Sequence, residues 1–352
     1  MSPRIKSGGV EKLNRATLIV AELSANHNQS LKTALETIHA AKEAGADAVK
    51  LQTYTADTLT INCTNNYFTE LLDGTIWEGK SFYQLYKDAH TPWEWHAELF
   101  DYARSLDLDI FSSPFDKTAV DFLETLNPSR YKIASFEIVD LPLIRYVASM
   151  NKPIIISTGI ATLADIEAAV HACIKSGNEN ITLLKCTSSY PAPLNEANLL
   201  TIPKLKETFG VEVGLSDHTM GASAAIASVS LGATMIEKHF ILDREIGGPD
   251  ASFSMEPDEF EKMVISVREV EEALGEGNYN LTEKAAKSKV FARSLFIIKD
   301  VKAGEIITEE NVKSIRPGYG MHPKYYDDIL GKAFHRDHEK GTPLTWSMIV
   351  DD

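Results

Sequence analysis

Residues 17–52 read TLIVAELSANHNQSLKTALETIHAAKEAGADAVKLQ, and this stretch contains the unit that decides the fold. Two short apolar runs, Thr17–Leu23 and Asp47–Gln52, have the composition of buried strands. Between them, Leu31–Ala44 has the apolar spacing of an amphipathic helix, and Gly45 follows as a suitable C-terminal cap. Two apolar strands joined by such a helix are typical of a parallel sheet covered by helices.

The same unit recurs along the chain. Six further strand-like runs occur, and a helical pattern follows each of them. The runs are Leu108–Ser113, Tyr131–Ser135, Pro153–Thr158, Ile181–Thr187, Val211–Ser216 and Thr234–Phe240. One of these helices is expected to begin after an N-cap at Thr162 and to end at Ser176 before Gly177. Eight units within about 250 residues predict an α/β fold of the (β/α)8 TIM-barrel type. A doubly wound open sheet is the alternative, but no G-x-G-x-x-G follows the first strand.

The pattern changes after Leu274, where GEGNYN forms a polar, turn-rich break. Ser294–Ile298 then alternates like a strand, and Asp300–Glu310 indicates turns with a short helical start. We therefore expect a small, mostly β domain after the barrel. The predicted organisation is a flexible N-terminus at 1–16, a barrel domain at 17–275, a linker at 276–288 and the small domain at 289–352. Within the barrel, Cys63–Thr91 is longer than an ordinary strand-to-helix connection, so we expect it to lie over the barrel mouth.

Composition limits the classes of partner. The net charge of −15 argues against nucleic acid, and no apolar run approaches the roughly 18 residues of a membrane span. The start of the chain lacks the apolar core of a signal peptide. Cys63, Cys173 and Cys186 have no paired spacing, which indicates reduced thiols. These features favour a cytoplasmic protein with no membrane partner.

Polar or ionisable groups stand at or near the end of every predicted strand. They are Glu22, Ser24, Asn26 and His27; Lys50 and Gln52; Ser112 and Ser113; Lys132 and Ser135; Ser157 and Thr158; Thr187, Ser188, Ser189 and Tyr190; Ser216, Asp217 and His218; and Glu237, Lys238 and His239. In a TIM barrel these ends meet at one rim, where active sites are built. Burying a polar group without a partner costs about 1–3 kcal/mol, so packing alone does not explain eight such ends.

A pair of histidines suggests a metal site. His218 and His239 end neighbouring strands, and neutral imidazoles in that position bind borderline divalent ions while leaving coordination positions open. A single strand-end histidine is more often a hydrogen-bonded structural residue. The pair, together with Glu22, which we expect across the barrel, favours the metal interpretation.

Two lysines on apolar strands have competing interpretations. Lys50 and Lys132 are suited to binding phosphate and carboxylate as point charges, or one of them to forming a Schiff base as in an aldolase. A third interpretation makes each an ordinary surface lysine at a strand end. The neighbouring hydroxyl side chains favour an oxyanion-rich ligand. Ser157-Thr158-Gly159 either presents backbone N–H groups to an anion or forms an ordinary turn.

In combination, these segments resemble the sialic acid synthase family. The segments that carry the resemblance are AELSANH at 21–27, KLQT at 50–53, SSPF at 112–115, YKIAS at 131–135, STG at 157–159, GLSDH at 214–218 and IEKHF at 236–240. FARSL at 291–295 and RPG at 316–318 are similar to the family's C-terminal antifreeze-like (SAF) domain. The likeness extends from about residue 17 to 350, and the order of its motifs is specific.

The resemblance implies an enzyme that condenses phosphoenolpyruvate with an amino-sugar aldehyde and releases phosphate by C–O cleavage. It implies a divalent metal ion, typically Mn2+ with Mg2+ or Co2+ as alternatives, bound by His218 and His239. Glu22 would stabilise the cationic intermediate or orient water, and we expect it to stay ionised beside the lysines. The phosphoenolpyruvate would be held by Lys50, Ser113, Lys132, Ser135, Ser157 and Ser216. Tyr190 and Asp250 would meet the sugar, and Gln52 would help line the site. Arg316 would reach the N-acyl group of the sugar from the partner subunit of a domain-swapped homodimer.

Three local features favour the pseudaminic acid branch of that family: QTYT at 52–55, IASFE at 133–137 and RPGYGMHPK at 316–324. Ser188 stands where the N-acetylneuraminate branch usually has Asn, which favours the same choice. N-acetylneuraminate and legionaminate synthesis are the alternatives within the family. Outside it, the alternatives are a Schiff-base aldolase using Lys132 and a non-catalytic carbohydrate-binding or ice-binding protein.

Overall fold

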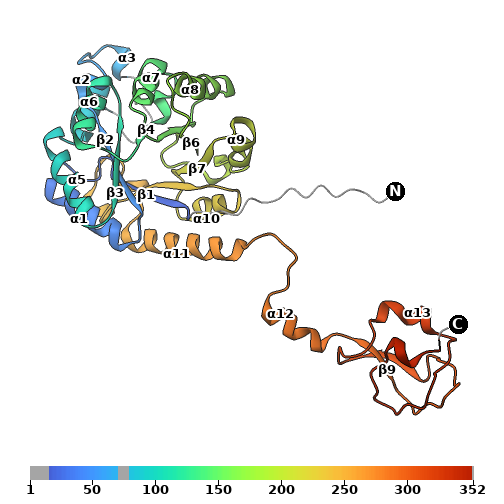
Figure 1. The fold of residues 1–352 in the computed structure, drawn as a ribbon. Coiled ribbons are helices and arrows are strands. Elements are labelled where there is room, and N and C mark those ends of the chain that lie inside the picture. The colour runs from blue at the N-terminus through green and yellow to red at the C-terminus, as the bar shows by residue number, and fades with distance from the viewer. Residues whose placement is uncertain (1–15, 70–78, 351–352) are drawn as a thin grey trace. The chain divides into compact units, whose positions relative to one another are not determined.

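The computed structural model describes residues 16–69 and 79–350, which form two compact units (Figure 1). The division falls between Glu276 and Gly277. The predicted flexible N-terminus lies outside the described residues, apart from residue 16. The segment predicted as a linker, 276–288, contains helix α12 (Glu283–Lys287).

The first unit is a closed barrel of eight parallel strands that follow one another in chain order. The strands are β1 (Leu18–Glu22), β2 (Ala48–Thr53), β3 (Asp109–Pro114), β4 (Tyr131–Ile133), β5 (Ile154–Ser157), β6 (Ile181–Cys186), β7 (Glu212–Asp217) and β8 (Met235–His239). β8 pairs with β1 and closes the barrel, with Leu18 opposite Met235 and Glu22 opposite His239. The predicted TIM barrel is confirmed, and the open-sheet alternative is wrong.

Helices alternate with these strands and cover the barrel. Within the described residues they are α1 (Leu31–Glu43), α2 (Ala56–Leu59), α3 (Asn66–Thr69), α4 (Phe82–Ala89), α5 (His96–Ser105), α6 (Lys117–Leu126), α7 (Leu141–Ser149), α8 (Leu163–Lys175), α9 (Thr201–Phe209), α10 (Ser223–Ser230) and α11 (Pro257–Leu274). The expected caps are present. Gly45 has a φ of 85° just after α1, and the Thr162 hydroxyl accepts a hydrogen bond from the Asp165 N–H at the start of α8.

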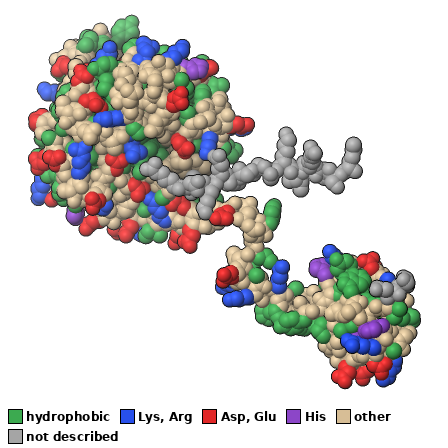
Figure 2. Space-filling view, in the orientation of Figure 1, with side chains coloured by type: hydrophobic (Ala, Val, Ile, Leu, Met, Phe, Trp, Pro, Cys, Tyr) green, Lys and Arg blue, Asp and Glu red, His purple; other side chains and the backbone are tan. Residues whose placement is uncertain are grey.

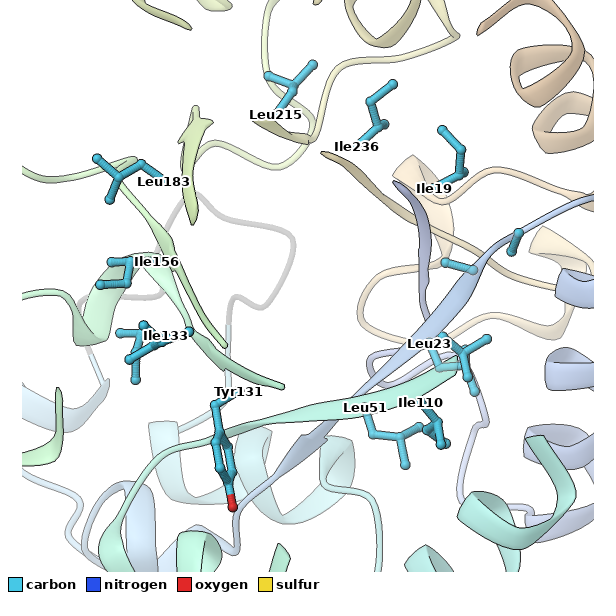
Figure 3. Close-up of a cluster of buried hydrophobic side chains, with 14 of the residues drawn as sticks. Ile19, Leu23, Leu51, Ile110, Tyr131, Ile133, Ile156, Leu183, Leu215 and Ile236 are labelled. Atoms are coloured by element: carbon cyan, nitrogen blue, oxygen red, sulfur yellow. The ribbon is translucent and has the colours of Figure 1, made fainter. Parts of the chain in front are cut away.

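The barrel strands bury side chains on both faces, since successive residues point in opposite directions. The outer layer packs against the helices and includes Ile19, Leu51, Ile110, Ile133, Ile156, Leu183, Leu215 and Ile236 (Figure 3). The inner layer consists of Val20, Ala48, Phe111, Ile155, Leu184 and Met235. Two residues further along their strands, Glu22, Lys50 and Glu237 point into the same interior. They therefore lie above a packed, apolar floor.

The long connection predicted at Cys63–Thr91 contains α3 and α4, while residues 70–78 lie outside the described part. Phe82, Leu85 and Tyr86 of α4 line a cavity together with His239, the last residue of β8. The expectation that this segment lies over the barrel mouth is therefore confirmed for α4.

The second unit is small and mostly β. An antiparallel pair, β9 (Ser294–Ile297) and β10 (Val312–Ile315), is supplemented by isolated bridges such as Val301 to His338, and one helix, α13 (Tyr326–Ile329), follows. Its core has ten buried residues, which are Leu295, Ile297, Val301, Ile307, Val312, Met321, Ile329, Phe334, Leu344 and Ile349. The short helical start predicted within Asp300–Glu310 is wrong. Turns and bridges take its place, because Gly304 adopts a φ of 79° and Ile306 pairs with Ala333.

Acidic and basic side chains are interspersed over the visible face of the barrel unit (Figure 2). None of the helices in the described ranges combines the length and the apolar character needed to cross a bilayer. Cys63, Cys173 and Cys186 are all free thiols, and the last two are buried.

Candidate active site

Four charged side chains meet inside the barrel, directly above the apolar floor. Lys50 Nζ lies 2.5 Å from Glu22 Oε2, and Lys132 Nζ lies 2.7 and 2.9 Å from the two carboxylate oxygens of Glu237. Lys50 is also 3.9 Å from Glu237. All four residues are at most 5% exposed. Such burial is tolerated because each charge has an opposite partner.

This environment shifts the ionisation of the two carboxyl groups in opposite directions. Burial works against ionisation of Glu237, but the ammonium groups of Lys132 and Lys50 overcome it and lower its pKa to about 2. Burial raises the pKa of Glu22 above its usual value, against the attraction of Lys50 and with added repulsion from Glu237. We expected the lysines to keep the pKa of Glu22 low. Its pKa is raised instead, because the desolvation of Glu22 outweighs the attraction of the lysines.

Glu237 did not figure among the expected site residues. Its signal was present in the sequence, because it precedes His239 by two positions and therefore faces the same side of β8. What the sequence did not indicate is its partner. Lys132 lies 105 positions earlier in the chain.

Uncharged side chains complete this layer. Ser113 accepts a hydrogen bond from Lys50 at 3.3 Å, and Ser216 donates to Glu237 at 3.1 Å. Gln52 donates to Glu22 at 2.9 Å. The Ser157 hydroxyl is buried and has no hydrogen-bond partner among the described residues. A buried hydroxyl without a partner at the end of β5 is suited to an oxyanion ligand.

The two predicted metal-binding histidines do come together. The ring centroids of His218 and His239 are 5.3 Å apart, and the Tyr190 ring lies 4.5 Å from that of His218. The expectation that Glu22 lies across the barrel is wrong. β1 and β8 are neighbours, and Glu22 is in register with His239.

The contacts of these histidines fit a divalent ion, although their pKa values shift in opposite directions. Burial works against the charged form of His218, but the Cys186 side chain and the Thr187 carbonyl oxygen raise its pKa above the usual value. Burial and the adjacent His218 lower the pKa of His239 well below its usual value, which leaves a neutral imidazole. The Nδ1 atom of His239 is buried without a hydrogen-bond partner in the described structure. His218 Nδ1 lies 2.9 Å from the Thr187 carbonyl oxygen, so this nitrogen donates and Nε2 remains available as a ligand. Across residues 16–69 and 79–350, no three His, Cys, Asp or Glu side chains form a complete metal site. The pair therefore fits an open centre that is completed by water or substrate.

A small-residue corner forms where β4, β5 and β6 end. The Ser188 hydroxyl donates to Ser135 at 2.8 Å, and a Cβ added to Gly159 would collide with both hydroxyl groups. The idea that the Ser157-Thr158-Gly159 turn presents its N–H groups to an anion is weakened. Of that turn, the Thr158 N–H already donates to the Leu184 carbonyl, and the N–H of Ile160, which follows the turn, donates to the Ser135 hydroxyl.

A cavity of about 410 Å³ opens at the barrel mouth. Gln52, Tyr190 and Asp250 line it, and Asp250 Oδ2 lies 3.8 Å from His239 Nδ1. Their expected role near the sugar stays a prediction. Glu137 also lines the cavity and was missed. Burial raises its pKa to about 7, and its Oε2 atom has no hydrogen-bond partner in the described structure. Arg316 belongs to the second unit and is exposed there, so its expected role in the site stays a prediction.

A (β/α)8 barrel with paired lysines, paired carboxylates and two neighbouring histidines at the carboxyl ends of its strands has the arrangement of a TIM-barrel enzyme. Comparison with known families narrows this class. The NeuB family matches residues 37–279, and the SAF domain matches residues 292–350. The chain belongs to the NeuB family, the family of sialic acid synthases that its motifs resemble.

Individual relatives extend over almost the whole chain. A pseudaminic acid synthase of Helicobacter pylori is 52% identical over 328 residues, covering 93% of this chain and 96% of its own. An N,N'-diacetyllegionaminic acid synthase of Campylobacter jejuni is 38% identical, with 93% and 98% covered. Among solved structures, the spore coat polysaccharide biosynthesis protein SpsE of Bacillus subtilis aligns with a TM-score of 0.66 at 34% identity, covering 96% of each chain.

Proposed function

We propose that this protein is a pseudaminic acid synthase, which condenses phosphoenolpyruvate with 2,4-diacetamido-2,4,6-trideoxy-L-altrose. C3 of phosphoenolpyruvate forms a bond to the aldehyde carbon of the sugar, and water adds to C2. The bond between C2 and the bridging oxygen then breaks, and its electron pair leaves with inorganic phosphate. The aldehyde oxygen becomes a hydroxyl group by taking up a proton.

The observation that carries this proposal is the buried cluster of Lys50, Lys132, Glu22 and Glu237 beside the paired rings of His218 and His239. Two ammonium groups held in a dry site are suited to bind the carboxylate and phosphate of phosphoenolpyruvate. Two paired carboxylates keep those ammonium groups in place before the substrate arrives. The choice of the altrose rests on the 52% identity to a pseudaminic acid synthase, compared with 38% to a legionaminic acid synthase.

The residues have distinct proposed roles. Lys50 and Lys132 bind the phosphoenolpyruvate with Ser113, Ser135, Ser157 and Ser216, while Tyr190, Asp250 and Gln52 orient the sugar. His218 and His239 would hold a divalent ion, in our proposal Mn2+, which would supply Lewis-acid polarisation of the aldehyde. Glu22, hydrogen-bonded to Gln52 and beside Lys50, is placed to stabilise positive charge at C2 or to orient the attacking water.

We also propose a cytoplasmic homodimer in which the C-terminal unit of one copy covers the barrel rim of the other. Support comes from exposed apolar side chains on the loops that follow β4 to β7. They are Phe136, Val139, Ile160, Leu163, Leu194, Leu200 and Met220. The second unit exposes Tyr319, three residues after Arg316. A concentration of exposed apolar side chains after successive barrel strands is what a protein interface on this rim requires. A monomer by light scattering at micromolar concentration would contradict this arrangement.

Phosphate release from phosphoenolpyruvate tests the function directly. We expect release in the presence of Mn2+ with the trideoxy-altrose, little with N-acetylmannosamine, and none after chelation. Phosphoenolpyruvate labelled with 18O at the bridging oxygen should transfer its label to phosphate. Label retained in the sugar acid would contradict C–O cleavage. Release only with N-acetylmannosamine would assign the chain to the N-acetylneuraminate branch instead.

One observation favours a second candidate. Burial lowers the pKa of Lys132, as a Schiff-base lysine requires. Both oxygens of Glu237, however, lie within 2.9 Å of its Nζ atom and favour the ammonium form. Borohydride added during turnover separates the two mechanisms. A trapped covalent adduct on Lys132 would replace the synthase mechanism with that of an aldolase.

A further inference from the structure

The cavity at the barrel mouth has two chemically different sides. Gln52, Tyr190, His239 and Asp250 form a polar side, which continues downward to the ion-paired cluster. The remaining lining is largely apolar. It includes Tyr54, Leu59, Phe82, Leu85, Tyr86 and Phe115.

Four aromatic rings of this lining form one continuous surface, which we call the aromatic wall (Tyr54, Phe82, Tyr86 and Phe115). The Tyr54 ring contacts Phe115 edge-on at a centroid distance of 5.1 Å and Tyr86 at 5.8 Å. Phe82 stacks on Tyr86 at 5.9 Å with the planes only 6° apart. The wall joins the ends of two barrel strands to α4, because Tyr54 follows β2 and Phe115 follows β3.

The wall is held rigidly around the cavity. The Tyr54 carbonyl accepts a hydrogen bond from the Trp93 indole at 3.1 Å. The end of α4 is tied to the loop after β1, because the Gln29 side chain donates to the carbonyl oxygens of Asp88 and His90 at 3.0 and 2.6 Å. A preformed aromatic surface of this kind loses little entropy when a ligand binds against it.

The direction in which the sugar enters follows from the proposed chemistry. The aldehyde carbon must meet phosphoenolpyruvate at Lys50 and Lys132, so it lies at the polar, deep end. The far end of the acceptor, which carries C6, then extends toward the mouth and the aromatic wall. Phe82 and Phe115 offer no hydrogen-bonding group there.

We propose that the aromatic wall determines acceptor specificity by packing against the C6 methyl group of a 6-deoxy sugar. This inference rests on the proposed function and adds the structural element that selects the sugar. A methyl group gains by leaving water against such a surface. A C6 hydroxyl packed against Phe82 and Phe115 loses water without finding a partner on those two rings. An apolar contact of this kind discriminates against an added hydroxyl group by about a hundredfold at most.

The test uses two acceptors that differ in one oxygen atom. They are 2,4-diacetamido-2,4,6-trideoxy-L-altrose and its 6-hydroxy counterpart, 2,4-diacetamido-2,4-dideoxy-L-altrose. We expect the wild-type protein to favour the 6-deoxy acceptor in kcat/KM by roughly 10- to 100-fold. Phe82→Ser and Phe115→Ser should each reduce that preference about tenfold, mainly by losing activity on the 6-deoxy sugar. Phe209→Ser is the matched control, because Phe209 is a half-buried phenylalanine at the end of α9 that does not line this cavity.

The outcomes separate this inference from the proposed function. A wild-type protein that uses both altroses equally well, or variants that lower both rates by the same factor, would refute the role of the wall while leaving the synthase reaction intact. A protein inactive with both altroses would refute the proposed acceptor itself. If the serine variants do not fold, as judged by circular dichroism, Phe82→Tyr replaces them. Its added hydroxyl should shift the preference toward the 6-hydroxy sugar, and an unchanged preference would again count against the wall.

Discussion

Lys238→Met is expected to disturb both histidines of the site without touching either. Lys238 and Asp217 form a buried pair at 2.7 Å, and each side chain is 1% exposed. Lys238 also donates to the Thr219 carbonyl oxygen at 2.5 Å, and the other Asp217 oxygen accepts from the Thr219 N–H at 2.9 Å. The pair therefore holds the backbone on both sides of His218 and directly before His239.

The size of the expected loss of stability follows from the burial of Asp217, the partner of Lys238. Removing the ammonium group leaves the Asp217 carboxylate uncompensated inside the protein, which costs about 3–5 kcal/mol. We expect urea to unfold the barrel of Lys238→Met at a clearly lower concentration than wild type. The affinity for Mn2+ should fall by roughly 10- to 100-fold, as when residues that orient metal ligands are removed. Titration of Mn2+ followed by electron paramagnetic resonance measures this loss independently of turnover.

Two further variants make this prediction decisive. Asp217→Asn combined with Lys238→Met removes the unpaired charge and should recover part of the lost stability. Lys302→Met breaks an exposed pair with Asp337 and should leave the unfolding midpoint unchanged. A Lys238→Met protein with wild-type stability and wild-type Mn2+ affinity would refute the reasoning.

Four other changes have defined outcomes. The pKa of Glu137 is raised from 4.5 to about 7, so its contribution to stability is complete below pH 4.5 and is lost as the pH rises through 7. The difference in free energy of unfolding between Glu137→Gln and wild type, measured with urea, should therefore rise by about 3 kcal/mol in favour of the variant from pH 4.5 to pH 8. Equal pH profiles for the two proteins would contradict this. Glu22→Gln should lower kcat about a hundredfold in the phosphate-release assay, whereas full turnover would remove its catalytic assignment. His239→Ala should lose at least about tenfold in Mn2+ affinity by the same titration, and unchanged binding would exclude it as a ligand. Gly159→Ala should raise KM for phosphoenolpyruvate by displacing Ser135 and Ser188, and an unaltered KM would place the substrate elsewhere.

Much of the site was predictable because a parallel barrel converts sequence position into spatial position. Polar residues at the ends of all eight strands must meet at one rim, whatever the details of packing. Alternation along a strand then separates residues that face the interior, such as Glu237 and His239, from Lys238, which faces away. The two histidines that we propose as metal ligands and the two lysines could be found on this basis.

The sequence by itself determined the strand order, the polar rim and the family, because these depend on local patterns and on motifs in a fixed order. The tertiary structure decided which charges neutralise one another. Lys132 forms an ion pair with Glu237, which lies 105 positions later in the chain, and Lys50 pairs with Glu22 of the neighbouring strand. It also decided that Glu22 lies beside His239, because the last strand closes on the first. The aromatic wall depends on tertiary structure for the same reason. Its rings come from two strand ends and a helix in a connecting segment, and only the closed barrel brings them to one cavity.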